Sequence, residues 1–225
     1  MDNYKLYIFD WDGTLMDSIG RIVSSLQAAA RALSLEPPTD EAAKSIIGLS
    51  LVPAIERLFP LVTESQTEQL IAEYRQQYLH ENTVPSPMFE HVDVMLGALR
   101  SQGKLVAVAT GKNRPGLNKM LSDTNTGEYF HQTICACEAE SKPNPRMLEI
   151  LLQDLGVETH EALMIGDSIH DLTMANNAGI DSVGITLGAD TKKSLEKCQP
   201  NVIVDSISEL IQLLTGAPVH SHQNV

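Results

Sequence analysis

Six short runs of apolar residues, spread along the chain and separated by helical patterns and turns, set the strongest limit on the fold. None of these runs alternates polar with apolar residues, as expected for strands that helices cover on both faces. Apolar runs that alternate with helical patterns are typical of βαβ units, which build parallel sheets. The sequence therefore predicts an α/β fold with a doubly wound parallel sheet, whose strands are Leu6–Phe9, Leu105–Ala109, Thr133–Ala136, Ala162–Ile165, Ser182–Ile185 and Val202–Val204.

Residues 17–85 interrupt this alternation. Apolar residues recur there at helical spacing, from Ile19 to Leu33 and again from Leu70 to Tyr78, with proline-marked turns between them. We interpret the segment as an all-helical insertion after the first strand. The chain is thus predicted to have two domains, a Rossmann-like core of residues 1–16 and 86–225 and a helical domain of residues 17–85.

The chain is acidic, with 16 Lys and Arg against 29 Asp and Glu in 225 residues and a net charge of −13. Such a surface repels nucleic acid phosphates and anionic lipid headgroups, so we expect neither nucleic acid nor a membrane as a partner. No apolar run approaches membrane-spanning length, and the three cysteines form no metal-type doublets, so we expect a cytoplasmic protein. Residues 215–225 are interpreted as a loose tail.

Two carboxylates directly follow the first predicted strand, in the segment Asp10-Trp11-Asp12-Gly13-Thr14. Side chains two residues apart in an extended chain point the same way, so Asp10 and Asp12 can face one site. Gly13 allows the chain to turn sharply away. Burying two adjacent carboxylates is costly unless a cation neutralises them, although the segment alone is also compatible with an ordinary acidic turn.

Two further segments offer groups that can bind an anion. Thr110 and Gly111 follow the second strand, where a hydroxyl and a backbone N–H can donate to a phosphoryl oxygen. The same Thr-Gly pair is also common at the start of an ordinary loop. Lys142 is followed by the segment Pro143-Asn144-Pro145, and proline at this position fixes the backbone next to the lysine. A lysine held in this way serves as a point charge for phosphate, but taken alone it also fits a surface lysine before a helix.

A second acidic pair, Asp167 and Asp171, follows the fourth predicted strand at the start of a helix. One of these carboxylates can ligate a cation while the other orients it, and oxygen-only ligands suit Mg²⁺. Asp167 is also well placed as a helix cap. Because the carboxyl ends of parallel strands share one edge of an open sheet, all four segments are expected to converge there.

In order and approximate spacing, these four segments resemble the four motifs of the haloacid dehalogenase superfamily. The resemblance covers nearly the whole chain, including a small helical cap between the first two motifs, and the details are similar to the phosphoglycolate-phosphatase-like branch. Asp12 is present, whereas haloacid dehalogenases proper lack an acid there. The stretch Ile19–Val23 lacks the histidine that β-glucose phosphate mutases usually carry in the first cap helix.

The resemblance implies a Mg²⁺-dependent phosphatase that hydrolyses a small, phosphoglycolate-like phosphomonoester through an aspartyl-phosphate on Asp10. Asp12 would be the general acid and base. The metal would be held by Asp10, the backbone carbonyl of Asp12 and Asp167. The roles implied for the remaining residues are phosphate binding by Thr110, Gly111 and Lys142, with Lys142 also catalytic, and orientation of Lys142 or a metal-bound water by Asp171.

Four matters remain to be weighed at the level of sequence. The same chemistry serves inorganic pyrophosphatases and sugar-phosphate phosphotransferases or mutases, and these remain alternatives to a phosphatase acting on a small metabolite. A non-enzymatic binding module is disfavoured because Asp10, Asp12, Lys142 and Asp167 are all present. The oligomeric state is either monomer or homodimer. Any of the basic residues of the helical segment could meet a second anionic group of the substrate, although each also fits a solvated helix face: Arg21, Lys44, Arg57 and Arg75. Lys112 and Arg114, beside the second motif, are better candidates because that loop borders the site.

Overall fold

The computed structural model describes residues 3–216. Its centre is a six-stranded sheet in the order β3-β2-β1-β4-β5-β6, in which every neighbouring pair is parallel. The predicted doubly wound parallel sheet is therefore confirmed. The strands are β1 (Leu6–Phe9), β2 (Leu105–Thr110), β3 (Gln132–Cys135), β4 (Ala162–Gly166), β5 (Asp181–Ile185) and β6 (Val202–Val204).

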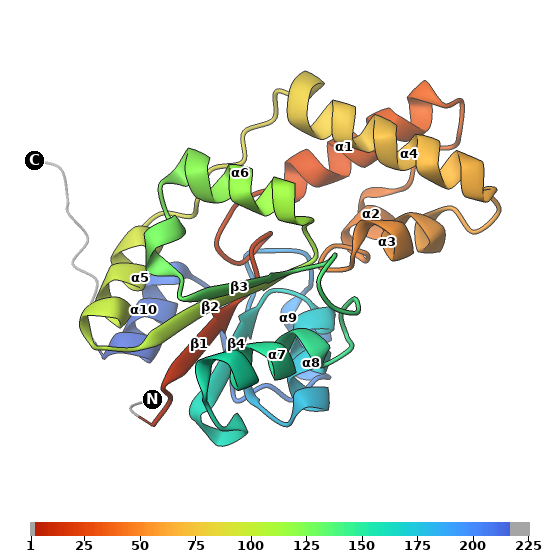
Figure 1. Cartoon of the computed structure of the whole chain (residues 1–225). Coiled ribbons are helices and arrows are strands. Elements are labelled where there is room, and N and C mark those ends of the chain that lie inside the picture. The colour runs from red at the N-terminus through yellow and green to blue at the C-terminus, as the bar shows by residue number, and fades with distance from the viewer. Residues whose placement is uncertain (1–2, 217–225) are drawn as a thin grey trace, which may run out of the picture.

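Helices cover both faces of this sheet (Figure 1). Tyr7 and Phe9 of β1 point to one face, where they belong to a buried cluster shared with α5 and α10. Leu6 and Ile8 point to the other face and share a cluster with α7 and α8. Both faces of β1 are fully buried, which explains its unbroken apolar sequence. The helices of this part are α5 (Val92–Ser101), α6 (Arg114–Thr124), α7 (Arg146–Leu155), α8 (Ile169–Ala178), α9 (Lys192–Glu196) and α10 (Ile207–Thr215), with short 3₁₀ turns η2 (Gly127–Tyr129) and η3 (Thr159–Glu161).

The segment between β1 and α5 is helical and lies beyond the carboxyl ends of the strands (Figure 1). Its own apolar cluster has all of its buried members between residues 19 and 78. A capping box of Thr63 and Gln66 begins one helix, and the apolar face of another packs inward from Ile19 to Ala30. The proposed boundaries at 17–85 stay a prediction. The helices are α1 (Ile19–Ala32), α2 (Asp40–Lys44), α3 (Leu51–Leu58), α4 (Glu64–Gln76) and the π-helical turn η1 (Gln77–Glu81).

The structure corrects several predicted boundaries by one residue. Thr110 and Gly166 are the last residues of their strands rather than loop residues, because they pair with Cys135 and Gly184 of the neighbouring strands. Ala136 falls outside β3. Thr215, which was assigned to the tail, is the last residue of α10, and residues 217–225 of that predicted tail lie outside the described part.

Candidate active site

Three of the predicted site residues stand at the carboxyl ends of adjacent central strands. Asp10 follows β1, Thr110 ends β2 and Asp167 follows β4, and each is buried to about the same degree, at 1% exposure. The backbone N–H of Asp10 donates to the carbonyl of Ile165 at 3.0 Å, which extends the pairing of β1 with β4 beyond the strands. Parallel strand order therefore brings segments far apart in the sequence to one edge of the sheet.

Lys142 joins two of the predicted carboxylates. Its Nζ lies 2.7 Å from Oδ1 of Asp10 and 2.6 Å from Oδ1 of Asp171, and its side chain is fully buried. The other oxygen of Asp171 accepts from the backbone N–H and the hydroxyl of Ser168, at 3.1 and 2.7 Å. Asp171 is thereby fixed at the start of α8, and its Oδ1 is left to accept from Lys142.

Both oxygens of Asp167 are also held. Oδ1 accepts from the Thr14 hydroxyl at 2.7 Å, and Oδ2 accepts from the backbone N–H of Ala189 at 2.7 Å. The chain passes close to this carboxylate at Gly13 and Gly188, where a Cβ would overlap it. Gly13 also has a positive φ of 79°, a conformation that glycine adopts without steric cost. The sequence prediction that Gly13 allows a sharp turn is confirmed, and the turn makes room for Asp167.

The electrostatics of this group favour a bound cation. Carboxylate oxygens of Asp10, Asp167 and Asp171 lie within 4.8 Å of one another, and Lys142 is the one ammonium in contact with them among the described residues. Burial raises the pKa of Asp10 to about 7, against the lowering effect of Lys142. Burial, followed by the charges of Asp171 and Asp10, also raises the pKa of Asp167 well above its ordinary value. A divalent cation would offset this excess of negative charge, and the all-oxygen donor set suits a hard ion such as Mg²⁺.

Asp12 belongs to a different set of contacts. Its Oδ1 accepts from the Ser18 hydroxyl at 2.5 Å and pairs with Nζ of Lys112 at 2.9 Å. Its carboxylate is not part of the three-aspartate group, so the predicted metal role of Asp12 rests on its backbone carbonyl alone and stays a prediction. The structure keeps Asp12 near the site, at 9% exposure, with a hydroxyl and an ammonium on the same oxygen.

Lys112 and Arg114, the candidates for a second anionic group, are each paired with a carboxylate of the chain, and that role stays a prediction. Lys112 lies between Asp12 and Tyr78, with Nζ 5.1 Å from the centre of the Tyr78 ring. Burial alone would lower the pKa of Lys112, but Asp12, Tyr78 and Tyr74 together outweigh burial and the pKa is raised. Arg114 is paired with Glu138 at 2.6 Å and bonded to Thr133. No sequence pattern indicates these partners, which come from distant segments.

Thr110 and Gly111 form the remaining predicted element of the site. Oγ1 of Thr110 accepts from the backbone N–H of Lys112 at 3.2 Å, which turns the chain at the strand end. A Cβ on Gly111 would overlap the carbonyl oxygens of Gly48 and Leu49. The loop after β2 therefore touches the helical segment backbone to backbone, and a side chain at position 111 would force the two apart.

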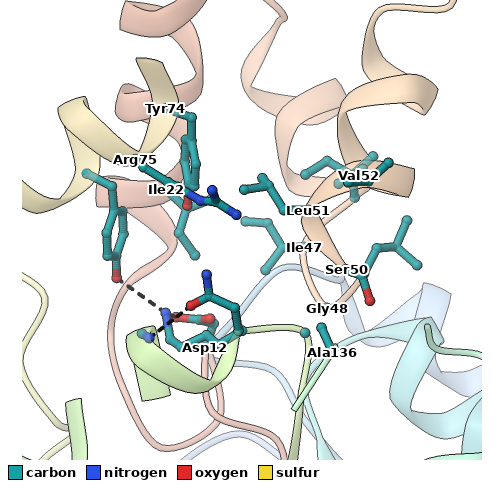
Figure 2. A pocket seen from close by; sticks show the side chains of 18 of the residues that line it. Asp12, Ile22, Ile47, Gly48, Ser50, Leu51, Val52, Tyr74, Arg75 and Ala136 are labelled. Carbon is teal, nitrogen blue, oxygen red and sulfur yellow. Dashed lines mark hydrogen bonds and ion pairs between the residues drawn. The ribbon is translucent and has the colours of Figure 1, made fainter. Parts of the chain in front are cut away.

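A cavity of about 760 Å³ opens between these loops and the helical segment. Asp10 and Asp12 line it together with Lys112, and Figure 2 shows Asp12 on one side with Tyr74 and Arg75 of α4 across from it. Sequence reasoning did not find the rest of the wall. Its residues include Ile22, Ile47, Leu51, Val52 and Leu79.

Comparisons with known proteins agree with this geometry. The family model of haloacid dehalogenase-like hydrolases matches residues 7–185. Probable phosphatase IndB of Dickeya dadantii is 35% identical over 212 residues, which cover 92% of this chain and 91% of that protein. Phosphoglycolate phosphatase of Pectobacterium atrosepticum is 30% identical over 220 residues, covering 96% and 94% of the two chains.

A solved structure shows the shared fold. A predicted phosphoglycolate phosphatase from Haemophilus somnus superposes with a TM-score of 0.86 at 24% identity, over 95% of this chain and 99% of that one. No described helix of the present chain is both long and apolar enough to cross a membrane. The resemblance expected from the four motifs is confirmed, and the chain belongs to the haloacid dehalogenase-like hydrolase family.

Proposed function

We propose that this member of the family is a Mg²⁺-dependent phosphatase that cleaves small phosphomonoesters through an aspartyl-phosphate on Asp10. The observation that carries the proposal is the position of Asp10. One of its oxygens is held by Lys142 at 2.7 Å, and among the described residues the other has no hydrogen-bond partner, while the residue lines the cavity. A carboxylate held at one oxygen and free at the other is suited to nucleophilic attack.

The metal would be held by Asp10 and Asp167, with the backbone carbonyl of Asp12. When bound, Mg²⁺ supplies positive charge that stabilises the phosphoryl oxygens and the ionised carboxylates. The remaining positive charge comes from the chain itself. Lys142 neutralises Asp10, and Asp171 fixes the angle of that ammonium through its 2.6 Å contact. The Thr110 hydroxyl and the Gly111 N–H are the donors proposed for the phosphoryl group.

In the first step, the free oxygen of Asp10 forms a bond to phosphorus as the bond from phosphorus to the leaving oxygen breaks. Asp12 gives its proton to that leaving oxygen, so an alcohol departs. In the second step, Asp12 takes a proton from water, whose oxygen attacks phosphorus, and Asp10 is released with free phosphate. Asp12 is two residues from Asp10 and lines the same cavity, which supports its role in both steps. The relatives named phosphatases support this chemistry. We further propose a cytoplasmic enzyme; monomer or homodimer stays a prediction.

Phosphate release from a panel of phosphorylated metabolites, with pyrophosphate and a sugar bisphosphate included, tests the proposal. We expect turnover with Mg²⁺ and none in EDTA, with unchanged circular dichroism. Asp10→Asn should abolish turnover, and acid-quenched wild-type enzyme should carry a phosphate on the peptide that contains Asp10. Asp123→Asn is the matched control, because that side chain is 51% exposed and pairs only with Lys119 among the described residues. Steady turnover by a verified, non-deamidated Asp10→Asn protein would contradict the assignment, and preference for pyrophosphate would favour the alternative function.

A further inference from the structure

The cavity beside Asp10 and Asp12 has walls that are largely apolar. Five large apolar side chains are substantially exposed in the described part of the chain, and two of them, Val52 and Leu79, line this cavity. Val52 is 49% exposed on α3 and Leu79 is 38% exposed on η1. They come from different elements and both leave apolar surface uncovered within one cavity. Such surface is stabilised when an apolar group covers it.

The apolar surface continues around the cavity. Ile22 and Leu26 contribute from α1, Ile47 comes from the segment before α3, and Leu51 is the first residue of α3. Figure 2 shows Ile22, Ile47 and Leu51 directed toward the same space, on the side away from the core loops. The core side adds Met120 and Ala136. A group that leaves Asp10 and Asp12 toward the helical segment would therefore meet mainly hydrocarbon.

Most of the lysine and arginine side chains that line the cavity already form ion pairs with aspartates of the chain. Lys112 is paired with Asp12 at 2.9 Å and Lys119 with Asp123 at 2.8 Å. Of the lysines and arginines that line the cavity, Arg75 alone has a side chain without an ion pair or hydrogen bond among residues 3–216. It lies on α4, across the cavity from Asp12 in Figure 2. A two-carbon acid bound at Asp10 would need a cation for its carboxylate close to the phosphoryl group, and Lys112 is already neutralised there.

The cavity is also larger than a two-carbon acid requires. Its volume of about 760 Å³ falls within the range of about 300–1,000 Å³ that is typical of sites for drug-sized ligands. We infer that the substrates are phosphomonoesters whose alcohol part is mainly apolar and larger than the two-carbon acid of phosphoglycolate. This inference rests on the proposed phosphatase function and specifies its substrate class.

A homologous series of alkyl phosphates, from ethyl to octyl, tests the inference against phosphoglycolate. If each added methylene is buried against the cavity wall, kcat/KM should rise by up to about fourfold per methylene until the cavity is filled. Hexyl phosphate should then exceed phosphoglycolate by at least about tenfold. A flat series, or a preference for phosphoglycolate, would overturn the inference while leaving the phosphatase proposal intact.

A variant pair locates the effect. Val52→Asn replaces an exposed apolar wall residue with a polar one, and it should lower kcat/KM for hexyl phosphate by about threefold to tenfold, with a smaller loss for ethyl phosphate. Leu61→Asn makes the same kind of change at a 96% exposed side chain of the helical segment that does not line the cavity, and it should leave both values unchanged. Equal losses at the two positions would overturn the inference.

Binding provides a readout that does not depend on turnover. Alkyl phosphonates of the same lengths and phosphonoacetate are titrated calorimetrically into the wild-type protein with Mg²⁺ present. We expect affinity to rise with chain length, a negative heat-capacity change that grows with it, and weaker binding of phosphonoacetate than of hexylphosphonate. If no ester is turned over at all, the phosphatase proposal fails and the substrate class fails with it, whatever the affinities. If esters are turned over, affinity that does not change with chain length would overturn the inference alone.

Discussion

Replacement of Lys142 by methionine should destabilise the protein far more than the same replacement at an exposed lysine. The Lys142 side chain is 0% exposed, and its partners Asp10 and Asp171 are 2% and 0% exposed. Lys142→Met keeps most of the side-chain volume but leaves three buried carboxylates without an ammonium. Breaking a buried ion pair by removing one partner costs about 3–5 kcal/mol. Against a typical total stability of about 5–15 kcal/mol, this is a large fraction of the free energy of unfolding.

The matched control for this prediction is Lys119→Met. Lys119 pairs with Asp123 at 2.8 Å on the surface of α6, with both side chains 51% exposed. Exposed pairs at this helical spacing contribute about 0.3–0.5 kcal/mol. Urea unfolding followed by circular dichroism, at pH 8 in EDTA, measures both variants. A difference between them below about 1 kcal/mol would refute the reasoning that burial makes the Lys142 contacts strong.

Two further predictions concern the carboxylates. Asp12→Ala should slow single-turnover phosphorylation of Asp10 by about 10² or more with an alkyl ester, whose alkoxide needs a proton, and by visibly less with an electron-poor aryl ester; equal losses, without trapped aspartyl-phosphate, would remove proton transfer from Asp12. In EDTA, the free energy of unfolding should fall as pH rises from about 4 to about 7, because burial raises the pKa of Asp10 from 3.8 to about 7 and the folded chain keeps a proton that the unfolded chain releases. Denaturant titrations at several pH values measure this slope, and added Mg²⁺ should flatten it. A free energy of unfolding that rises from pH 4 to pH 7 would show the opposite linkage.

The sheet could be predicted from sequence because its signal is local. An unbroken apolar run such as Leu6–Phe9 needs cover on both faces, and alternation with helices leaves few other ways to provide it. The convergence of Asp10, Thr110 and Asp167 followed from the parallel strand order, since their strands end at one edge. The proposed roles of these residues remain predictions, whereas their proximity is a property of the fold.

The contacts of Lys112 and the cavity wall could not be predicted in this way. The pairing of Lys112 with Asp12 and Tyr78 depends on how α4 and η1 sit over the core loops, which no short-range pattern specifies. Val52 and Leu79 look like ordinary apolar positions of helices in the sequence. Only the three-dimensional structure shows that both remain exposed and line the same cavity.

The central place of β1 has a consequence for biosynthesis. Its neighbours in the sheet begin at Leu105 and Ala162, about 100 and about 155 residues later in the chain. At roughly 5–20 residues per second, the ribosome needs about 8–30 s after making Leu6 to reach Ala162. Throughout that interval β1, an apolar strand whose final place is in the middle of the sheet, has at least one unpaired edge. Asp10 meets Asp167 only afterwards, so the active site is completed late in translation, when most of the chain has already been made.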